Sequence, residues 1–326
     1  MDFLTDPFLI EPAQFDGPVL VTGAGGCIGA WTLAILTRSG VPCIAFDLGD
    51  DRRRPALIMG EAAAAGLTWE TGDIADAERL ERIVSQHSVR AIVHLAGLQV
   101  PFCKANPAAG ARVNVEGTVN VLQAARNAGI KRTVYASSVA ALAMPPGGPY
   151  LPTLYGVYKQ ANEWTGAVYW QDWQVPSIGI RPNVVYGVAR DQGMSSKFTV
   201  GIHAAAAGVA YDMPLGGRIS WLYAGEAAAA FIACVSADRE GAPVFDLNGA
   251  TDTIENGLEM LKSLAPEAEV TASGSEFPFP PDLDDGPLRA HVGDYPSVPV
   301  RDGIEATYRA FKELTLSGQL GTSRVA

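Results

Sequence analysis

Short apolar segments alternate with longer amphipathic ones through the first 186 residues of this chain. The apolar segments, which we expect to be strands, are 19–22, 43–47, 67–70, 91–95, 133–137 and 177–181. The amphipathic segments, which we expect to be helices, are 28–39, 53–65, 77–87, 108–128 and 157–173. Because parallel neighbours must be joined by a helix-length crossover, this alternation predicts an α/β fold with a doubly wound parallel sheet.

The alternation weakens after Tyr186. Residues 187–221 and 250–300 are richer in glycine and proline, and FPFPPDLDDGP (277–287) reads as irregular chain. Between them we expect a helix over 224–237 and a strand over 244–247. We therefore predict two parts, which are a sheet domain of residues 1–186 with about 222–248, and a smaller discontinuous region of 187–221 with 249–326.

The charge of the chain limits its partners. Of 326 residues, 35 are acidic and 24 are lysine or arginine, which gives a formal net charge of −11. Phosphate groups are repelled by such a chain, so we expect a small-molecule substrate rather than nucleic acid or an anionic membrane. The one mixed run, Asp50–Arg54, we interpret as a solvated loop.

Cysteine and histidine usage indicates neither a disulfide framework nor a metal site. No CxxC pair occurs, and the four histidines lack ligand spacing. The first 18 residues lack a basic region, so we do not read them as a signal peptide, and no apolar run is long enough to span a membrane. We expect a cytoplasmic protein.

A glycine-rich turn, TGAGGCIGAW (22–31), joins the first expected strand to the first expected helix. The template G-x-G-x-x-G would need a third glycine where Ile28 stands, so the spacing that fits is Gly23-x-x-Gly26-x-x-Gly29. Glycines in this position let backbone amides approach a pyrophosphate at the start of the helix. The turn predicts a dinucleotide site, and the alternative is a glycine-rich turn without a ligand.

An acid ends the second expected strand. Asp47 follows Gly23 by 24 residues, where a carboxylate can accept hydrogen bonds from the adenosine ribose. This favours NAD over NADP, although Arg52, Arg53 and Arg54 leave room for a 2′-phosphate. The alternative is a surface aspartate at a strand end.

Tyr155 and Lys159 are four residues apart at the start of an expected helix, so their side chains share one face. An ammonium group near a phenol favours the phenolate, which predicts a lowered pKa for Tyr155 and a role as general acid and base. Tyr158 directly precedes the lysine and should point elsewhere. Ser137 and Ser138 end the preceding strand, where a hydroxyl can orient a substrate oxygen.

Together these residues resemble the extended short-chain dehydrogenase/reductase family, also called the NAD-dependent epimerase/dehydratase family. The matching motifs, in the expected order between about residues 18 and 190, are TGAGGCIG, Asp47, GDI (72–74), HLAG (94–97), VNVEGT (113–118), ASS (136–138), YGVYK (155–159) and RPNVVYG (181–187). The resemblance implies that the sheet domain is an NAD-binding Rossmann domain and that the smaller region binds the substrate.

The resemblance also implies roles for individual residues. Asp73 and Ile74 would flank the adenine, Lys159 would hold the nicotinamide ribose, and Ser138 matches the catalytic hydroxyl. Asn114 would join the catalytic set of Ser138, Tyr155 and Lys159, or else bond the backbone within its helix. The expected cofactor contacts are Gly23, Gly26, Cys27, Ile28, Gly29, Asp47, Asp73, Ile74, Leu95, Ala96, Gly97, Asn114, Tyr155, Lys159 and Pro182.

Two departures from the family pattern narrow the reaction. Val139, Ala140 and Ala141 follow Ser138 where family dehydratases and decarboxylases place carboxylates, so we do not expect elimination. Nucleotide-sugar members resemble one another in the motif R-P-x-N-V-Y-G.

In this chain Val184 stands at the asparagine position of that motif, and Asn183 is shifted by one residue, to the other strand face. This argues against a nucleotide-diphosphate substrate. Arg218 would match a substrate-phosphate arginine, or form a surface ion pair. The expected substrate residues are Ser138, Asn183 and Arg218.

We therefore expect hydride transfer between NAD and a secondary alcohol or carbonyl of a small polyhydroxylated or carbonyl compound. The alternatives are an NAD-dependent sugar epimerase and a non-enzymatic cofactor-sensing regulator. Specificity should come from 187–221 and 250–300. The family often dimerises through the helix that carries YxxxK and the helix before it, so we expect a homodimer.

Overall fold

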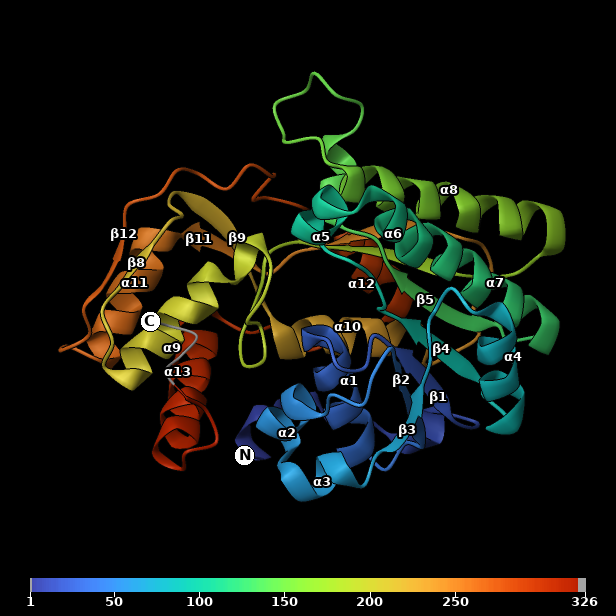
Figure 1. Ribbon diagram of the computed structural model, residues 1–326, viewed down its shortest axis with the longest axis horizontal. Coiled ribbons are helices and arrows are strands. Elements are labelled where there is room, and N and C mark those ends of the chain that lie inside the picture. Colours follow the sequence, from blue (N-terminus) through green and yellow to red (C-terminus); the bar gives the residue numbers. More distant parts are fainter. Residues whose placement is uncertain (1, 322–326) are drawn as a thin grey trace.

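The computed structural model describes residues 2–321 as a parallel sheet covered by helices, with a smaller group of elements beside it (Figure 1). The strands of this sheet are β1 (Val19–Thr22), β2 (Cys43–Asp47), β3 (Thr68–Thr71), β4 (Ala91–His94), β5 (Arg132–Ala136), β6 (Ile178–Pro182) and β10 (Val244–Leu247). Their spatial order is β3-β2-β1-β4-β5-β6-β10, and all neighbours are parallel. The predicted doubly wound sheet is confirmed.

The helices of this part lie on both faces of the sheet. They are α1 (Cys27–Arg38), α2 (Arg53–Met59), α3 (Glu61–Ala65), α4 (Ala77–Gln86), α5 (Val100–Ala105), α6 (Pro107–Ala111), α7 (Gly117–Ala128), α8 (Leu154–Trp173) and α10 (Ala224–Cys234). Alternate side chains of β1 enter different cores, because neighbours on a strand point to opposite faces. Val19 and Val21 pack with α1 and α10, whereas Leu20 packs with α4 and α7.

Local capping decides several helix ends. Thr153 accepts a hydrogen bond from the Gly156 amide, so α8 begins three residues before the expected start at 157. Gly60 has φ +86°, a left-handed value that favours glycine, and it divides the helix expected over 53–65 into α2 and α3. The helix expected over 108–128 consists of α6, one π-helical turn over Arg112–Glu116, and α7.

The C-terminal elements form the smaller group at the left of Figure 1. They include β7 (Val185–Tyr186), α9 (Lys197–Ala207), β8 (Tyr211–Met213), β9 (Arg218–Tyr223), β11 (Ala250–Thr253), α11 (Ile254–Leu264), β12 (Val270–Ala272) and α13 (Val300–Leu316). Helix α12 (Gly286–Val292) lies instead against β10, near the middle of the view. Strands β11, β9 and β7 form one small sheet, and β12 pairs with β8. The helix expected over 224–237 ends at Cys234, and the strand over 244–247 has the expected bounds.

The charge run Asp50–Arg54 is only partly the solvated loop that its composition predicts, because Asp50, Asp51 and Arg53 are exposed while Arg52 and Arg54 are half-buried. Arg53 and Arg54 begin α2, and the side chain of Arg54 is only 13% exposed. The Arg54 guanidinium lies 2.7 Å from Asp191 and donates to the Gly25 carbonyl, so it joins two distant parts of the chain. The expectation failed for Arg54 because the sequence does not show that an aspartate 137 positions further on folds back to this arginine.

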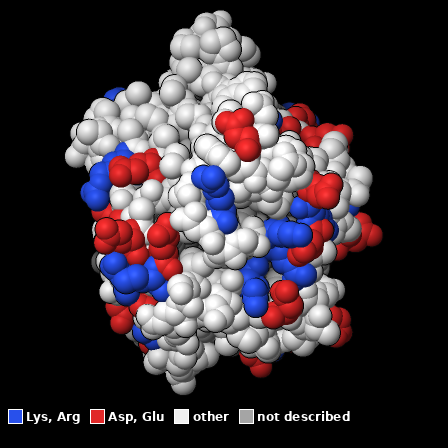
Figure 2. Space-filling view, turned by 90° about the vertical axis from the view of Figure 1, so that its right-hand side faces the viewer, with Lys and Arg blue, Asp and Glu red and all other residues white. Residues whose placement is uncertain are grey.

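Charged side chains of both signs are interleaved over much of the face in Figure 2, whereas the projecting top is uncharged. That projection is the loop between β5 and α8 (Figure 1), which has the sequence MPPGGPYLPT over 144–153. Among the described residues, no helix is long and apolar enough to cross a bilayer.

Candidate active site

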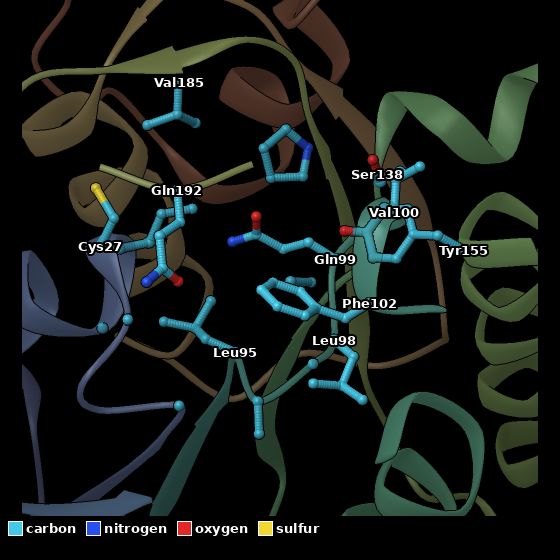
Figure 3. A pocket seen from close by; sticks show the side chains of 18 of the residues that line it. Cys27, Leu95, Leu98, Gln99, Val100, Phe102, Ser138, Tyr155, Val185 and Gln192 are labelled. Carbon is cyan, nitrogen blue, oxygen red and sulfur yellow. The ribbon is translucent and has the colours of Figure 1, made fainter. Parts of the chain in front are cut away.

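A cavity of about 580 Å³ opens where the carboxyl ends of β1, β2, β4, β5 and β6 meet. The chain leaves β1 and β4 in opposite directions across the sheet, and this change of order is where open α/β sheets bind their ligands. Figure 3 shows Cys27 on one side of the cavity, Ser138 and Tyr155 on the other, and the Gln99 amide between them. The cavity therefore connects the glycine turn with the YxxxK helix.

The glycine turn has no room for side chains. A Cβ on Gly29 would lie 2.2 Å from the Gly23 carbonyl oxygen, and one on Gly23 would lie 2.6 Å from the Ala96 amide nitrogen. Gly23 also has φ +69°, a left-handed value. The turn brings bare backbone to the start of α1, where unpaired amides attract phosphate oxygens. This arrangement fits the pyrophosphate of a dinucleotide.

A buried polar network holds the turn in place. The Thr22 hydroxyl lies 2.7 Å from His94 Nδ1, and His94 Nε2 lies 3.1 Å from the Thr118 hydroxyl. Burial lowers the pKa of His94 to about 3, with a smaller contribution from the charge of Lys159. The neutral imidazole therefore links β1, β4 and α7 without adding charge beneath the cavity.

Asp47 bonds the glycine turn directly. Its Oδ2 accepts from the Gly25 amide at 2.8 Å, and its Oδ1 accepts from the Leu48 amide at 2.7 Å. Gly25, which the glycine spacing does not require, thereby fixes this carboxylate at the rim of the cavity. A carboxylate has about four lone-pair directions, so acceptor capacity for ribose hydroxyls remains.

The three arginines that left room for a 2′-phosphate already have partners. Arg52 donates to Asp50 and to the carbonyls of Ala64, Ala65 and Leu67, and it stacks over Trp69. Arg53 lies 3.6 Å from Asp51, and Arg54 is paired with Asp191. These contacts support NAD rather than NADP.

Most of the remaining expected cofactor residues line the same cavity. These are Gly26, Cys27, Ile28, Asp73, Ile74, Leu95, Ala96, Gly97 and Pro182. Asp73 is paired with Arg112 at 2.9 Å and accepts from the Ala75 amide, while Ile74 is buried against Gly117. Asp73 and Ile74 therefore sit on the wall next to the end of β3, on the Asp47 side of the cavity.

Tyr155 and Lys159 converge as their spacing predicts. The Lys159 ammonium lies 5.5 Å from the centre of the Tyr155 ring and donates to the Ala136 carbonyl at 2.7 Å. The Tyr155 hydroxyl shares a hydrogen bond with Ser138, and both line the cavity (Figure 3). Tyr158 points elsewhere, as expected, and donates to the Pro107 carbonyl.

The predicted effect of Lys159 on the phenol is wrong for this structure. Burial raises the pKa of Tyr155, and the hydrogen bond with Ser138 and the charge of Arg190 only partly oppose that rise. Burial also lowers the pKa of Lys159 to about 8. The reason is that both groups are enclosed together and the ammonium points at a backbone carbonyl, so neither is free to stabilise the other's charge.

The two serines after β5 face different surroundings. The Ser138 hydroxyl accepts from the Ala140 amide and bonds Tyr155. The Ser137 hydroxyl donates to Glu163, which forms two 2.7 Å contacts with Arg181. Both residues line the cavity, but the Ser137 hydroxyl is bound to Glu163, whereas Ser138 lies beside Tyr155.

Asn114 is buried beneath the cavity and does not line it. Its amide nitrogen donates to the carbonyls of Leu98 and Gly110, while its Oδ1 has no partner. A Cβ on Gly97 would lie 2.8 Å from that oxygen and 3.4 Å from the Lys159 ammonium. The side chain thus bonds the backbone, on a π-helical turn of the kind often found at functional sites.

The two other residues expected to bind substrate have different positions. Asn183 lies on the cavity wall, but its amide nitrogen donates to Asn248 and to the Pro280 carbonyl, and its Oδ1 accepts from the Val184 amide. Arg218 lies outside the cavity at an exposed strand end, 2.8 Å from Asp282. The surface ion pair that the sequence left open is the arrangement seen, so we leave Arg218 out of the proposed substrate site.

The sequence motifs missed Gln99, Arg190 and Phe277, which also line the cavity. Arg190 donates to Ser195, its Nε is buried without a partner, and no carboxylate among residues 2–321 pairs with it at ion-pair distance. Its charge acts on both Cys27 and Tyr155, so it lies between the two ends of the cavity. The sequence does not reveal that this loop arginine lines the cavity, because the residues around it come from other segments.

A glycine cradle for pyrophosphate, an acid at the end of β2 and a Ser–Tyr–Lys set on one cavity define a dinucleotide-dependent enzyme of the extended short-chain dehydrogenase type. The profile of the family described as "NAD dependent epimerase/dehydratase family" matches residues 19–248. The chain belongs to this family, whose description names NAD as the cofactor on which its members depend.

Relatives and solved structures agree with this family. A UDP-glucose 4-epimerase of Azospirillum brasilense is 36% identical over 153 residues, which are 44% of this chain and 42% of that protein. A UDP-glucose 4-epimerase sequence of Klebsiella pneumoniae is 33% identical over 41% of this chain and 97% of its own length. The aligned part thus spans less than half of the Azospirillum enzyme.

Among solved structures, an L-threonine dehydrogenase of Clostridium difficile aligns with a TM-score of 0.77 at 20% identity, covering 91% of this chain and 98% of that one. A UDP-glucose 4-epimerase of Thermotoga maritima, solved with UDP-glucose, gives 0.75 at 20% identity over 91% and 99%. At these identities the likeness shows the shared fold.

Proposed function

We propose that this protein is an NAD-dependent dehydrogenase of a secondary alcohol or the corresponding carbonyl in a small polyhydroxylated or carbonyl compound. The observation that carries the proposal is that Ser138, Tyr155 and Lys159 lie together on the wall of one cavity with the glycine turn, with the Lys159 ammonium 5.5 Å from the centre of the Tyr155 ring. When bound, NAD supplies the acceptor for the hydride. The chain itself then has to move one proton at the substrate oxygen.

The Tyr155 hydroxyl is the group that moves this proton. Ser138 donates to the substrate oxygen and sets its distance from the phenol, since the two side chains already bond each other. Lys159 donates to the Ala136 carbonyl and would bind the ribose hydroxyls, while Asn114 holds the Leu98 carbonyl from below the cavity. No carboxylate follows Ser138, so elimination lacks its second acid or base.

The cofactor site uses the cavity residues on the Cys27 side. Gly23, Gly26 and Gly29 admit the pyrophosphate, and Asp47 accepts from the adenosine ribose. We assign substrate binding to the region of 187–221 and 249–326, which contributes Phe277 and Phe279 to the cavity wall, and cofactor binding to 1–186 with about 222–248. Cytoplasmic localisation is supported by the cysteines, whose four thiols are all free.

The test uses two tyrosines on one helix. The purified enzyme is incubated with NAD and a panel of alcohols, and NADH formation is measured for wild type, Tyr155→Phe and Tyr158→Phe. Loss of the acid and base should lower kcat by about 10²–10⁴-fold in Tyr155→Phe, while Tyr158→Phe, which removes a bond to a distant carbonyl, should keep its rate. Equal rates in all three proteins would contradict the proposal.

A second candidate is a sugar epimerase that oxidises its substrate transiently. The sequence similarity to UDP-glucose 4-epimerases favours it. Two observations argue against a nucleotide sugar as substrate. Arg218 lies outside the cavity, and Val184 stands at the usual asparagine position of the family motif. Incubation with UDP-glucose decides between the two, because an epimerase gives a product of altered stereochemistry and no net NADH.

We also propose a homodimer formed through α8 and α7. Exposed apolar side chains follow one another along α8, and Trp164 among them is 69% exposed. An apolar row of this kind on an amphipathic helix is usually covered by another surface.

A further inference from the structure

Beside Tyr155 the cavity is walled by apolar side chains from two separate segments. Val139 and Ala140 follow Ser138, and Phe277 and Phe279 come from the irregular C-terminal segment, while Tyr150 from the loop before α8 packs against the same cluster. All of them pack in one cluster with the ring of Tyr155. The two phenylalanine rings lie 5.3 Å apart. The ring of Tyr155 and this cluster thus form one continuous apolar stretch of the cavity wall.

This wall is held in place by hydrogen bonds from outside it. The Leu151 amide donates to the Pro278 carbonyl at 3.2 Å, and the buried Asn183 side chain donates to the Pro280 carbonyl at 2.9 Å. Asn248 and Thr251 both donate to the Pro281 carbonyl. The segment that carries Phe277 and Phe279 is thus a fixed part of the site rather than a loose loop.

The acidic groups of the cavity stand at its other end. Asp47 and Asp73 lie at the ends of β2 and β3, and Asp191 is paired with Arg54 beside the glycine turn. Around the apolar cluster, the hydroxyls of Ser138 and Tyr155 are needed for the reacting oxygen. Hydroxyl groups that lie on this cluster would lose their water without gaining partners, which is unfavourable, whereas Gln99 and Arg190 offer polar contacts elsewhere in the cavity.

We propose, on the basis of the function proposed above, that the substrate is a secondary alcohol or ketone bearing an aryl or branched alkyl group, which packs against Phe277, Phe279 and Val139. For the probe 1-phenylethanol, the carbinol C–H bond breaks and its electron pair passes to NAD as hydride, while the hydroxyl proton goes to Tyr155. The products are acetophenone, NADH and one proton. The proposal selects the carbonyl-compound branch over the sugar-like branch.

The experiment compares probes that differ in what they offer this wall. Initial rates with NAD are measured for 1-phenylethanol, 2-butanol, glycerol, L-threonine and UDP-glucose. A fitted apolar group changes kcat/KM by about 10–200-fold, so 1-phenylethanol should exceed 2-butanol and glycerol by at least about tenfold. Higher kcat/KM for glycerol, L-threonine or UDP-glucose than for 1-phenylethanol would overturn the proposal.

Substitutions in the apolar wall test whether its residues cause the preference for 1-phenylethanol. Phe277→Ala should lower kcat/KM for 1-phenylethanol by about tenfold and leave 2-butanol within about twofold. Phe279 is 5% exposed, so Phe279→Leu accompanies Phe279→Ala in case the latter unfolds. Phe245→Ala, which removes a ring packed on His291 outside the cavity, is the matched control and should keep the substrate preference. Equal losses on both alcohols in Phe277→Ala would contradict the proposal.

A binding measurement distinguishes failure of this inference from failure of the proposed function. The affinity of acetophenone for the protein with NAD is measured by calorimetry for wild type and Phe277→Ala. Suppose that no alcohol yields NADH, but acetophenone binds and Phe277→Ala lowers its affinity about tenfold. The proposed dehydrogenase function is then contradicted, and the inference about the substrate class stands. If acetophenone does not bind, the inference fails whatever the rates are.

Discussion

Two adjacent serines at the end of β5 have different neighbours, although they are only one position apart. Ser138 faces the cavity and bonds Tyr155, while Ser137 faces the Glu163–Arg181 pair. Neighbouring side chains of an extended segment point to opposite sides, so the two hydroxyls cannot share a role. The sequence shows two serines at the end of a strand, and only the opposite directions of their side chains in the structure distinguish them.

Alanine substitutions should separate the two roles. Ser138→Ala should lower kcat by about 10²-fold with little change in melting temperature, because it removes a donor to the reacting oxygen. Ser137→Ala should destabilise the fold by about 1–3 kcal/mol and leave kcat nearly unchanged, because it strips a partner from a partly buried carboxylate. Steady-state kinetics and denaturant unfolding measure both effects. A large kcat loss in Ser137→Ala alone would reverse the assignment.

The raised pKa of Tyr155 predicts different pH dependences for the two reaction directions. Burial keeps the phenol protonated near neutral pH, whereas alcohol oxidation needs the phenolate as base. The rate of oxidation should therefore rise as the pH increases from 7 to 9, whereas ketone reduction, which uses the protonated phenol, should stay nearly constant over the same interval. Initial rates in both directions test this, and an oxidation rate independent of pH would argue against Tyr155 as the base.

At the scale of elements, the carboxyl end of β2 sets the choice of cofactor. Asp47 stands at this end and is oriented by the Gly25 and Leu48 amides. Asp47→Asn replaces one anionic acceptor by an amide, which should raise the KM for NAD by about tenfold by weakening charge-assisted hydrogen bonds to ribose. The KM for NADP, whose 2′-phosphate is repelled by the carboxylate, should fall or stay constant. An equal rise for both cofactors would indicate general damage to the turn.

Helix α10 contains a buried acid that makes stability depend on pH. Burial raises the pKa of Glu226 to about 7, against a usual value of 4.5, and the Val298 amide and Arg289 only partly oppose it. The pKa of Glu226 is higher in the folded than in the unfolded state, so protonation of this acid stabilises the fold. The contribution is fully present below about pH 4.5 and is lost as the pH rises through 7.

Glu226→Gln mimics the protonated acid and keeps an acceptor for Val298. It should match wild type near pH 5 and exceed it by about 1–3 kcal/mol near pH 8. Urea unfolding at both pH values measures this difference. Glu259→Gln, at an exposed position of α11, is the control, and a Glu226→Gln gain that is equal at both pH values would contradict the pKa argument.

At the scale of the whole molecule, the row of exposed apolar residues on α8 predicts the assembly. Trp164→Glu should convert the proposed dimer into a monomer, because a charge would be buried at the interface without a partner. Light scattering after size exclusion measures the mass. Leu316→Glu, at an exposed apolar position on α13, should leave the mass unchanged. A wild-type protein of monomer mass would refute the dimer.

The sequence by itself determined the sheet, the glycine turn and the Tyr155–Lys159 pair, because strand alternation and helical spacing act over a few residues. Only the tertiary structure decided what surrounds them. The pKa of Tyr155 depends on its burial, and the partner of Arg54 and the wall formed by Phe277 and Phe279 depend on segments more than a hundred positions apart. Local rules place backbone and side-chain direction, whereas burial, charge pairing and cavity shape arise only when distant segments pack together.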